Sequence, residues 1–320
     1  MIPVALVVAL ALPATTADLP TPTPWQPGVI SGPIHDAAPA FTPDGRTVYF
    51  GRSVGGGRPY PAIYTSRLVA GRWTPPEIAP FSGRYSDMEP AMSPDGAFMI
   101  FVSSRPLRTG DPMLNGHYAG QDWPEGGGAL WRVDRTPSGW SRPYRLPDTV
   151  NVSASTFAPA VACDGTLYFM HPTEPSGRFH IYEARYRDGA YEAPRQMPFT
   201  QEAVSDVDPA VAADGSLIVF GSRRDPEIAV GSMDLFIAFK REDGEWGRPV
   251  HLGPKVNAAG SDAEARLSPD GRRLYFSSER LAADKPRDEK GWNNGKYNIW
   301  TTPLPPAALA RLKAVSIATP

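Results

Sequence analysis

A short pattern of apolar strands and polar turns recurs along most of this 320-residue chain. Its clearest copy is residues 87–105, D-M-E-P-A-M-S-P-D-G-A-F-M-I-F-V-S-S-R, with an apolar run after the Pro-Asp-Gly segment. The run F-M-I-F-V is apolar at consecutive positions, as in a strand buried on both faces, and Pro-Asp-Gly is typical of a tight turn. The pattern therefore predicts a strand, a turn and a second strand.

Four further copies of this unit follow the same order. They begin at Asp36, Thr156, Asp206 and Asp262. The turn aspartates of all five units are Asp44, Asp95, Asp164, Asp214 and Asp270, spaced 51, 69, 50 and 56 residues apart. A period near fifty residues with strand-turn-strand content is typical of a propeller rather than of a helical solenoid.

Two more strand-like pieces complete each repeat. The third strands contain the pairs Ile63-Tyr64, Leu130-Trp131, Ile181-Tyr182, Leu235-Phe236 and Ile299-Trp300. The fourth strands cover 73–78, 140–146, 191–197 and 246–252, and their fifth copy is at the front of the chain, at 25–30. We therefore predict an all-β fold, a five-bladed β-propeller of four-stranded blades, closed by the N-terminal strand pairing into the last blade. A six-bladed ring would need a blade without the turn motif, and no interval is long enough to hold one.

The turn motifs also carry a family resemblance. Ser93-Pro94-Asp95-Gly96 with Phe101, and Ser268-Pro269-Asp270-Gly271 with Tyr275-Phe276, resemble the WD40-like repeats of the TolB type, often called PD40 repeats. The resemblance covers roughly residues 25–304 and implies the propeller fold. Relatives of this type include periplasmic scaffold proteins, domains of prolyl-peptidase-like enzymes and oligogalacturonate lyases, so the resemblance leaves the function open. The chain shows no α/β-hydrolase domain beside the repeats, which argues against the peptidase alternative.

The two ends of the chain differ from the repeats. Residues 1–17 are an apolar run followed by small residues, which predicts a signal peptide, with a buried N-terminal strand or helix as the alternative. We expect a linker over 18–24, the propeller over 25–304 and a C-terminal tail over 305–320, as a short helix on the ring or as a frayed end. A signal peptide and the TolB-like resemblance together predict a periplasmic or secreted protein of a bacterial envelope.

Composition limits the partners. The formal net charge of −2 gives no electrostatic basis for binding nucleic acid, and no membrane span is expected in the mature chain. The single cysteine, Cys163, excludes an internal disulfide, so stability must come from the core and from ring closure. We expect a monomer that binds a protein partner or a carbohydrate ligand.

Chain direction brings one set of polar residues to a single rim. The loops entering the first strands and the loops leaving the second strands lie at the same end of each blade. These positions hold acids, Asp36, Asp87, Asp206 and Asp262, and basic residues, Arg52, Arg105, Arg223 and Arg280, with His171 in the third blade. Two long insertions, 106–128 and 281–296, join second to third strands and bring the aromatic residues Trp123 and Trp292 to this rim. The set predicts either ion pairs that join neighbouring blades or a ligand-binding surface for sugars or peptides.

A second column of acids, Glu89, Asp208 and Glu264, is less regular and is expected to face the central channel. With His117 and His171 these acids are our candidate catalytic residues, for hydrolysis of a glycosidic bond by two carboxylates or for elimination from an acidic sugar. A Ca²⁺ site among the carboxylates is a further alternative, although no D-x-D-x-D-G loop supports it.

The sequence therefore leaves two functions open. The first is an exported, non-catalytic propeller, with a TolB-like scaffold or binding role, that binds a ligand or protein partner on the insertion-bearing face. The alternative is a carbohydrate-active hydrolase or lyase that uses the acidic residues around the channel.

Overall fold

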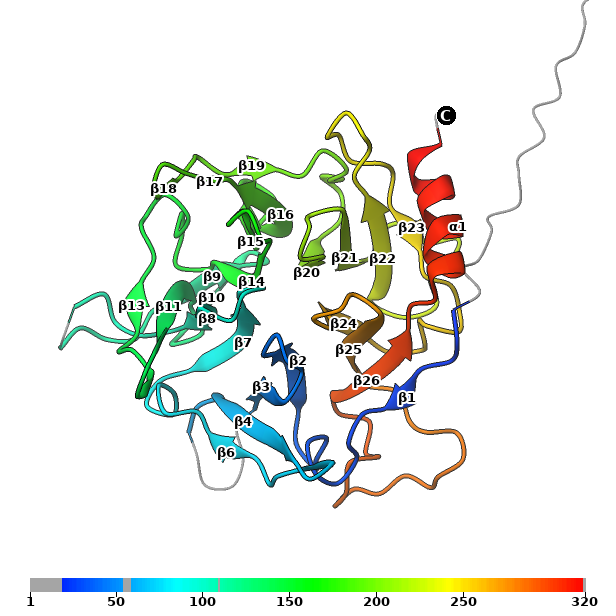
Figure 1. Cartoon of the computed structure of the whole chain (residues 1–320). Coiled ribbons are helices and arrows are strands. Elements are labelled where there is room, and N and C mark those ends of the chain that lie inside the picture. Colours follow the sequence, from blue (N-terminus) through cyan, green and yellow to red (C-terminus); the bar gives the residue numbers. More distant parts are fainter. Residues whose placement is uncertain (1–18, 54–58, 109, 319–320) are drawn as a thin grey trace, which may run out of the picture.

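The protein is an all-β, five-bladed propeller, as the repeat pattern predicts (Figure 1). A computed structural model describes residues 19–53, 59–108 and 110–318. The predicted signal peptide, 1–17, lies outside the described residues. Figure 1 looks down the ring, with the first strand of each blade nearest its centre.

Each blade is an antiparallel sheet. In the first four blades the strands follow the chain from the centre outward, and in the fifth the N-terminal strand takes the outermost place. The first blade consists of β2 (Asp36–Phe41), β3 (Thr47–Arg52), β4 (Ala62–Val69), β5 (Arg72–Trp73) and β6 (Glu77–Ile78). The second consists of β7 (Asp87–Met92), β8 (Phe98–Ser103), β11 (Ala129–Thr136), β12 (Gly139–Trp140) and β13 (Tyr144–Arg145). The third consists of β14 (Phe157–Val161), β15 (Leu167–Thr173), β16 (Arg178–Ala184) and β19 (Arg195–Gln196), with a separate hairpin of β17 (Tyr186–Arg187) and β18 (Ala190–Tyr191). The fourth consists of β20 (Asp206–Val211), β21 (Leu217–Ser222), β22 (Asp234–Phe239) and β23 (Val250–His251). The fifth consists of β24 (Asp262–Leu267), β25 (Arg273–Ser278), β26 (Asn298–Pro303) and the N-terminal strand β1 (Thr23–Pro24).

Strand β1 closes the ring. Thr23 pairs with Thr301 of β26, and the Trp25 N–H donates to the Ile299 carbonyl at 2.8 Å. The Trp25 ring then packs edge-on against Phe41 of the first blade, 5.3 Å between ring centres. Closure by the N-terminal strand is thus confirmed. The strand begins two residues before Trp25, inside the segment for which we expected a linker, and Leu19 in the same segment is fully buried.

Every innermost strand contains the same β-bulge. The register between first and second strands shifts in all five blades, which leaves one residue of each first strand in the left-handed region. These residues are Ala38, Glu89, Ala158, Asp208 and Glu264, with φ of 50°, 52°, 49°, 56° and 51°. A bulge re-aims its side chain, and left-handed φ is uncommon for residues other than glycine. The bulge therefore fixes how the second column of acids lies in the channel.

The C-terminal tail forms helix α1 (Pro306–Ile317), which packs on the fourth blade (Figure 1). Leu312 joins the core of the fourth and fifth blades, and the Ser316 hydroxyl accepts the Phe239 N–H at 3.1 Å and donates to the Arg248 carbonyl at 2.8 Å. The helix therefore covers an outer edge that β23 leaves open. Within the described part of the chain, no helix is long and apolar enough to span a membrane.

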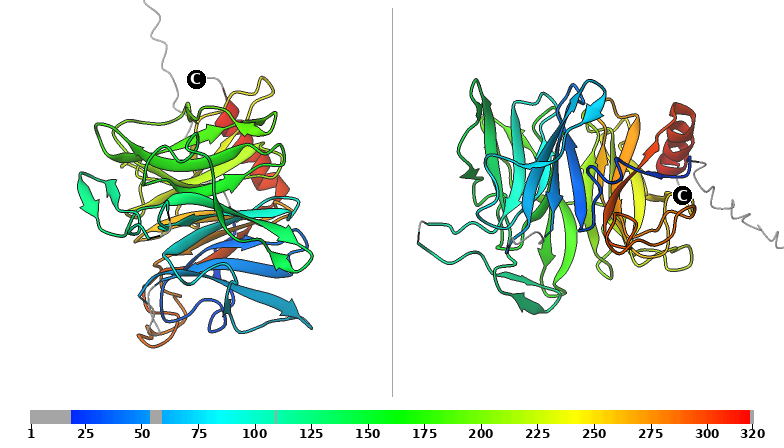
Figure 2. Two further views of the ribbon diagram at one scale, coloured as in Figure 1. Left: turned by 90° about the vertical axis from the view of Figure 1, so that its left-hand side faces the viewer. Right: turned by 90° about the horizontal axis from the view of Figure 1, so that it is seen from below.

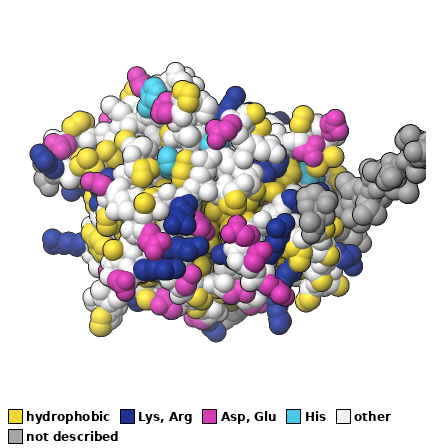
Figure 3. Space-filling view, turned by 90° about the horizontal axis from the view of Figure 1, so that it is seen from above, with side chains coloured by type: hydrophobic (Ala, Val, Ile, Leu, Met, Phe, Trp, Pro, Cys, Tyr) yellow, Lys and Arg dark blue, Asp and Glu magenta, His cyan; other side chains and the backbone are white. Residues whose placement is uncertain are grey.

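The two faces of the ring differ. The tight Asp-Gly turns lie on one face, which we call the turn face, and both long insertions leave the other, the insertion face (Figure 2). The first insertion forms a hairpin of β9 (Gly116–Tyr118) and β10 (Gln121–Trp123). Its two turn residues, Ala119 and Gly120, have φ of 53° and 73°, as a type I′ turn requires. Seen from above the view of Figure 1, the side of the ring carries interspersed acidic and basic side chains (Figure 3).

Candidate functional site

The first column of acids forms buried ion pairs inside the blades. The oxygens of all four aspartates lie close to guanidinium nitrogens: Asp36 to Arg52 at 2.5 Å, Asp87 to Arg105 at 3.0 Å, Asp206 to Arg224 at 2.7 Å and Asp262 to Arg280 at 2.6 Å. Each pair joins the first strand of a blade to the end of its own second strand. The structure therefore corrects the expectation of pairs between neighbouring blades.

The fourth-blade partner is Arg224 and not Arg223, the residue that we predicted from the sequence. Arg224 is buried and makes two 2.7 Å contacts with the Asp206 carboxylate, while Arg223 is exposed. A signal in the sequence could have found it. In the second, fourth and fifth blades the arginine stands four residues after a buried phenylalanine of the second strand, at Phe101, Phe220 and Phe276.

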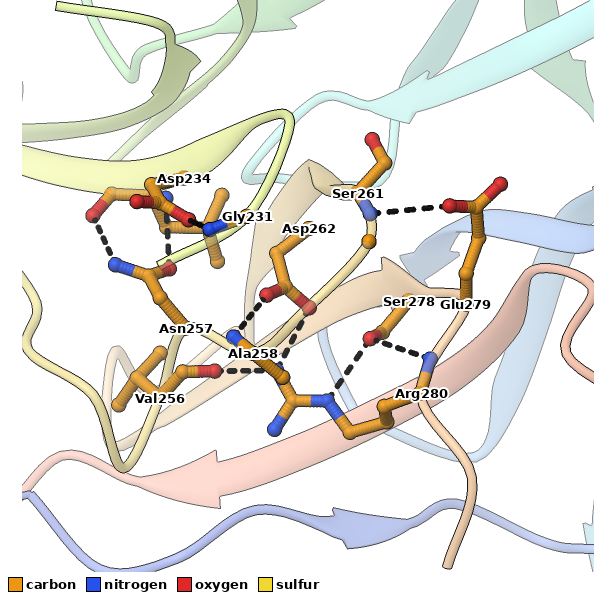
Figure 4. Close-up of polar contacts among 12 residues, drawn as sticks. Gly231, Asp234, Val256, Asn257, Ala258, Ser261, Asp262, Ser278, Glu279 and Arg280 are labelled. Atoms are coloured by element: carbon orange, nitrogen blue, oxygen red, sulfur yellow. Dashed lines mark hydrogen bonds and ion pairs between the residues drawn. The ribbon is translucent and has the colours of Figure 1, made fainter. Parts of the chain in front are cut away.

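Each of these arginines also holds the chain that arrives from the preceding blade. Arg105 Nη2 donates to the Phe81 carbonyl at 2.6 Å, and its guanidinium lies 5.1 Å from the centre of the Phe101 ring. Figure 4 shows the fifth-blade example, in which Arg280 lies between Asp262 and the Val256 carbonyl. Burial raises the pKa of Asp36 to about 6 although the Arg52 charge opposes the shift. This is the arrangement of a structural ion pair that stacks on an aromatic ring.

The third blade keeps the stacking on an aromatic ring but has uncharged residues in place of both the aspartate and the arginine. Thr156 occupies the aspartate position, and its hydroxyl donates to the Ser153 carbonyl at 3.1 Å. His171 occupies the arginine position, with its ring 4.0 Å from that of Tyr182 at an angle of 24°. Burial lowers the pKa of His171, which keeps its imidazole neutral near pH 7. The His171 side chain therefore replaces the stacked guanidinium without needing a carboxylate.

The second column of acids converges in the central channel from three different blades. Glu89, Asp208 and Glu264 interact electrostatically, and Arg266 belongs to the same group. Burial together with the neighbouring carboxylates raises the pKa of Glu89 to about 8 and that of Glu264 to about 7. Carboxyl groups that are protonated near neutral pH can act as general acids, so the cluster has a property that catalysis requires.

Two of these acids also have a structural task. Glu89 Oε2 accepts the N–H of Ala158 in the next blade at 2.7 Å, and Asp208 Oδ2 accepts the N–H of Glu264 in the next blade at 3.2 Å. The donors belong to bulge residues, whose N–H groups take no part in the regular ladder of the sheet. The first and third blades have alanine at the equivalent positions, Ala38 and Ala158, and cannot make this contact. Glu89 therefore joins the inner strands of the second and third blades, and Asp208 those of the fourth and fifth.

A hollow of 380 Å³ lies on the insertion face between the first insertion and the third blade. It brings together the two candidate histidines, His117 and His171. Its other lining residues are Asn115, 152–155 and 172–174. His117 Nδ1 lies 2.7 Å from Asp122 Oδ1, and the His117 side chain is 62 % exposed. Amide, imidazole and hydroxyl groups in one hollow suit a polar ligand such as a sugar or a peptide.

An aromatic pair stands beside this hollow. The rings of Tyr118 and Trp123 are stacked 5.3 Å apart at 12°, and Trp123 is 39 % exposed. Tyr118 in turn packs against Phe157 of β14 and Phe179 of β16 in the third blade. Burial and the Glu89 charge raise the pKa of Tyr118, so its hydroxyl stays protonated. The hairpin therefore holds an exposed aromatic surface next to His117, which lines the hollow.

The second insertion contributes less to the surface than the sequence predicts. Trp292 is half-buried, with its ring centre 6.3 Å from that of Trp300, and packs against the core of the fourth and fifth blades. Asn293 and Asn294 are buried, and their side-chain amides hold the loop by donating to backbone carbonyls. Among the residues that the structure describes, no group of three or more His, Cys, Asp or Glu side chains could hold a metal ion.

The fold is a closed five-bladed propeller, and several solved structures are similar to it. TolB from Acinetobacter baumannii matches with a TM-score of 0.48 and 17 % identity, over 85 % of this chain and 55 % of that one. A protein of unknown function from Dyadobacter fermentans matches with a TM-score of 0.51 and 14 % identity, over 89 % and 98 %. The catalytic domain of a GH62 α-L-arabinofuranosidase from Coprinopsis cinerea matches with a TM-score of 0.48 and 12 % identity. This match covers 89 % of this chain and 98 % of that one.

These similarities concern the fold. The chain spans about half of the A. baumannii TolB, and a shared function does not follow from identities this low. The propeller fold is the one that the resemblance to TolB-type repeats implies, and TolB structures are among the similar solved structures. No protein-family model matches the sequence. No curated protein matches it either.

Proposed function

We propose that the protein is an exported propeller that binds a ligand or a protein partner on its insertion face without catalysing a reaction. The observation that carries this proposal is the exposed Tyr118–Trp123 stack beside the hollow that His117 and His171 share. Aromatic platforms next to amide and imidazole groups suit the faces and hydroxyls of sugars or the side chains of peptides. Export and a periplasmic or secreted location are part of the proposal and are supported by the pattern of residues 1–17.

The first column of acids supports a non-catalytic role. Asp36, Asp87, Asp206 and Asp262 are almost completely buried and ion-paired with arginines, so their oxygens are not free to meet a ligand. The rim residues predicted from the sequence, whether for ligand binding or for catalysis, thus divide into two groups. The Asp–Arg pairs build the rim, while Trp123 and the two histidines present groups on it.

Binding is tested by a thermal-shift screen against neutral and acidic oligosaccharides and short peptides. A ligand at a hundred times its dissociation constant adds roughly 2.7 kcal/mol of stability, which such a screen detects. We expect Trp123→Ala to abolish the shift given by a ligand that stabilises the wild type. Tyr186→Ala is the matched control, because Tyr186 is an equally exposed aromatic in a small hairpin, β17–β18, packed against Tyr191. Equal shifts in both variants would contradict the proposed site.

A second candidate function rests on the channel acids. The raised pKa values of Glu89 and Glu264 are typical of carboxyl groups that act as general acids, which favours a carbohydrate-active hydrolase or lyase. On that hypothesis His117 or His171 assists from the hollow. The hypothesis predicts that Glu89→Gln keeps the fold, because glutamine retains the oxygen that accepts the Ala158 N–H, but abolishes turnover. Full activity of this variant would exclude the assignment.

A further inference from the structure

A second cavity, of 430 Å³, lies on the turn face, opposite the insertion face. It occupies the mouth of the central channel, between the five innermost strands and the turns that follow them. Pro43 and Pro269, at its outer edge, are exposed, so the cavity opens to solvent there. Its wall is mainly proline, alanine and other apolar residues. We call this cavity the turn-face funnel.

One level of the funnel is a ring of small residues with one exception. Each innermost strand contributes the residue two positions after its bulge residue, and all five line the cavity. Four blades place an alanine there, and the fifth places an arginine: Ala40, Ala91, Ala160, Ala210 and Arg266. The alanines leave the space open, and the arginine brings a single positive charge to it.

The Arg266 guanidinium is buried and incompletely bonded. The residue is 7 % exposed, and its Nη1 donates to the Ala265 carbonyl at 2.7 Å. Its Nε and Nη2 have no hydrogen-bond partner among the residues that the structure describes. The charges of Glu89, Asp208 and Glu264 act on the guanidinium, yet none of these acids forms a hydrogen bond to either nitrogen. A buried cation with two nitrogens whose N–H groups donate no hydrogen bond is costly unless another group supplies acceptors.

We propose that the turn-face funnel binds a small organic carboxylate, whose acid group accepts hydrogen bonds from Arg266 and whose apolar body lies against the alanine and proline wall. The planar guanidinium presents its donors in a fork that matches the two oxygens of a carboxylate. The cavity lining is mainly apolar, Arg266 is its buried cation, and its polar residues include three serines and the exposed Asp214 and Asp270. A cavity of this volume with an apolar lining and a few polar groups has the usual form of a small-molecule site. The site is independent of the insertion-face surface, because the two lie on opposite faces of the ring.

Calorimetric titration with benzoate and hexanoate tests the proposal, with benzamide and hexanamide as neutral counterparts of the same shape. We expect saturable binding of at least one carboxylate and about tenfold weaker binding of its amide. Arg266→Ala should remove this difference between acid and amide. The variant has the residue that the other four blades carry at this level, which favours retention of the fold.

Two further variants separate the charge from the cavity. Ala210→Leu narrows the funnel without altering Arg266, and we expect it to weaken binding of acid and amide alike. Arg266→Lys keeps a positive charge but loses the fork, and we expect weaker carboxylate binding even if the alanine variant does not fold. Lack of saturable binding of both carboxylates up to about 10 mM in the wild type would overturn the proposal. Unchanged carboxylate affinity in the arginine variants would overturn it as well.

Discussion

At the scale of single residues, the stability of the rim depends on which arginine each buried aspartate uses. Arg224 forms the fourth-blade pair with Asp206, and its neighbour Arg223 is exposed. Arg224→Ala leaves a buried carboxylate without its partner, so we expect a loss of about 3 kcal/mol in the free energy of unfolding. Arg223→Ala should change that free energy by less than about 0.5 kcal/mol. Urea denaturation of both variants measures the two values, and equal losses would contradict the assignment.

The channel acids predict a dependence of stability on pH. Burial and neighbouring charge raise the pKa of Glu264 from 4.5 to about 7 in the folded protein. The folded state therefore holds a proton that the unfolded state has released, and stability falls as pH rises from about 4.5 through 7. Glu264→Gln removes the charge, so we expect it to raise stability at pH 8 by on the order of 1–2 kcal/mol and to have little effect at pH 4.

Thermal unfolding of the wild type and this variant across pH 4–8 checks the prediction. Glu227→Gln, at an exposed glutamate, is the control and should follow the wild-type profile. A Glu264→Gln variant that loses stability at pH 8 would show instead that the charged carboxylate stabilises the fold.

Residue patterns in the sequence predict which residues lie on the rim better than they predict which residues line the channel. The recurrence of aspartate at the start of four first strands predicts its place on the rim correctly. The pairing inside a blade could not be predicted, because it depends on how the second strand leaves the sheet after Phe220 or Phe276. Arg266 escapes sequence reasoning because it replaces an alanine in a single blade, and one substitution in five repeats has no periodic signal.

At the scale of elements, the short strand β1 has a role out of proportion to its two residues. It gives the fifth blade its outer strand, and Leu19 and Trp25 on either side of it are buried. The test compares a chain beginning at Asp18 with a chain beginning at Gln26, which lacks β1 and the buried side chains of Leu19 and Trp25. We expect the shorter chain to be less stable by several kcal/mol and to associate through the open edge of β26.

Trp25→Ala separates packing from edge protection in this experiment. The substitution removes a buried aromatic side chain, which should lower the free energy of unfolding by about 3–5 kcal/mol, but it leaves β1 in place. Denaturant unfolding and sedimentation velocity should therefore show a destabilised monomer for this variant and self-association only for the truncated chain. A truncated chain that remains monomeric and as stable as its parent would contradict closure by β1.

The elements themselves are largely predictable, and their irregularities are not. Alternation of apolar strands and Asp-Gly turns predicts five blades and the permuted closure, because both follow from local pattern and chain order. The bulge in each innermost strand has no such local signal, since non-glycine residues such as Glu89 and Ala158 adopt positive φ there under the constraint of the ring. That bulge decides which side chains reach the channel.

At the scale of the whole molecule, the ring has two faces of different construction. The insertion face carries an exposed aromatic hairpin and two histidines, and the turn face opens into an apolar funnel with one arginine. Between them the channel acids join inner strands across blades. In this arrangement Glu89 and Asp208 each join two neighbouring blades, and the two faces carry the surfaces for which we propose binding.

The central claim, binding without catalysis, is tested most directly by following the fate of a ligand. Any oligosaccharide that stabilises the wild type is incubated with the pure protein, and its mass is then measured over time. We predict that the ligand is recovered intact and that Glu89→Gln gives the same thermal shift as the wild type. Formation of product by the wild type, lost in Glu89→Gln, would contradict binding without catalysis and identify the channel acids as catalytic.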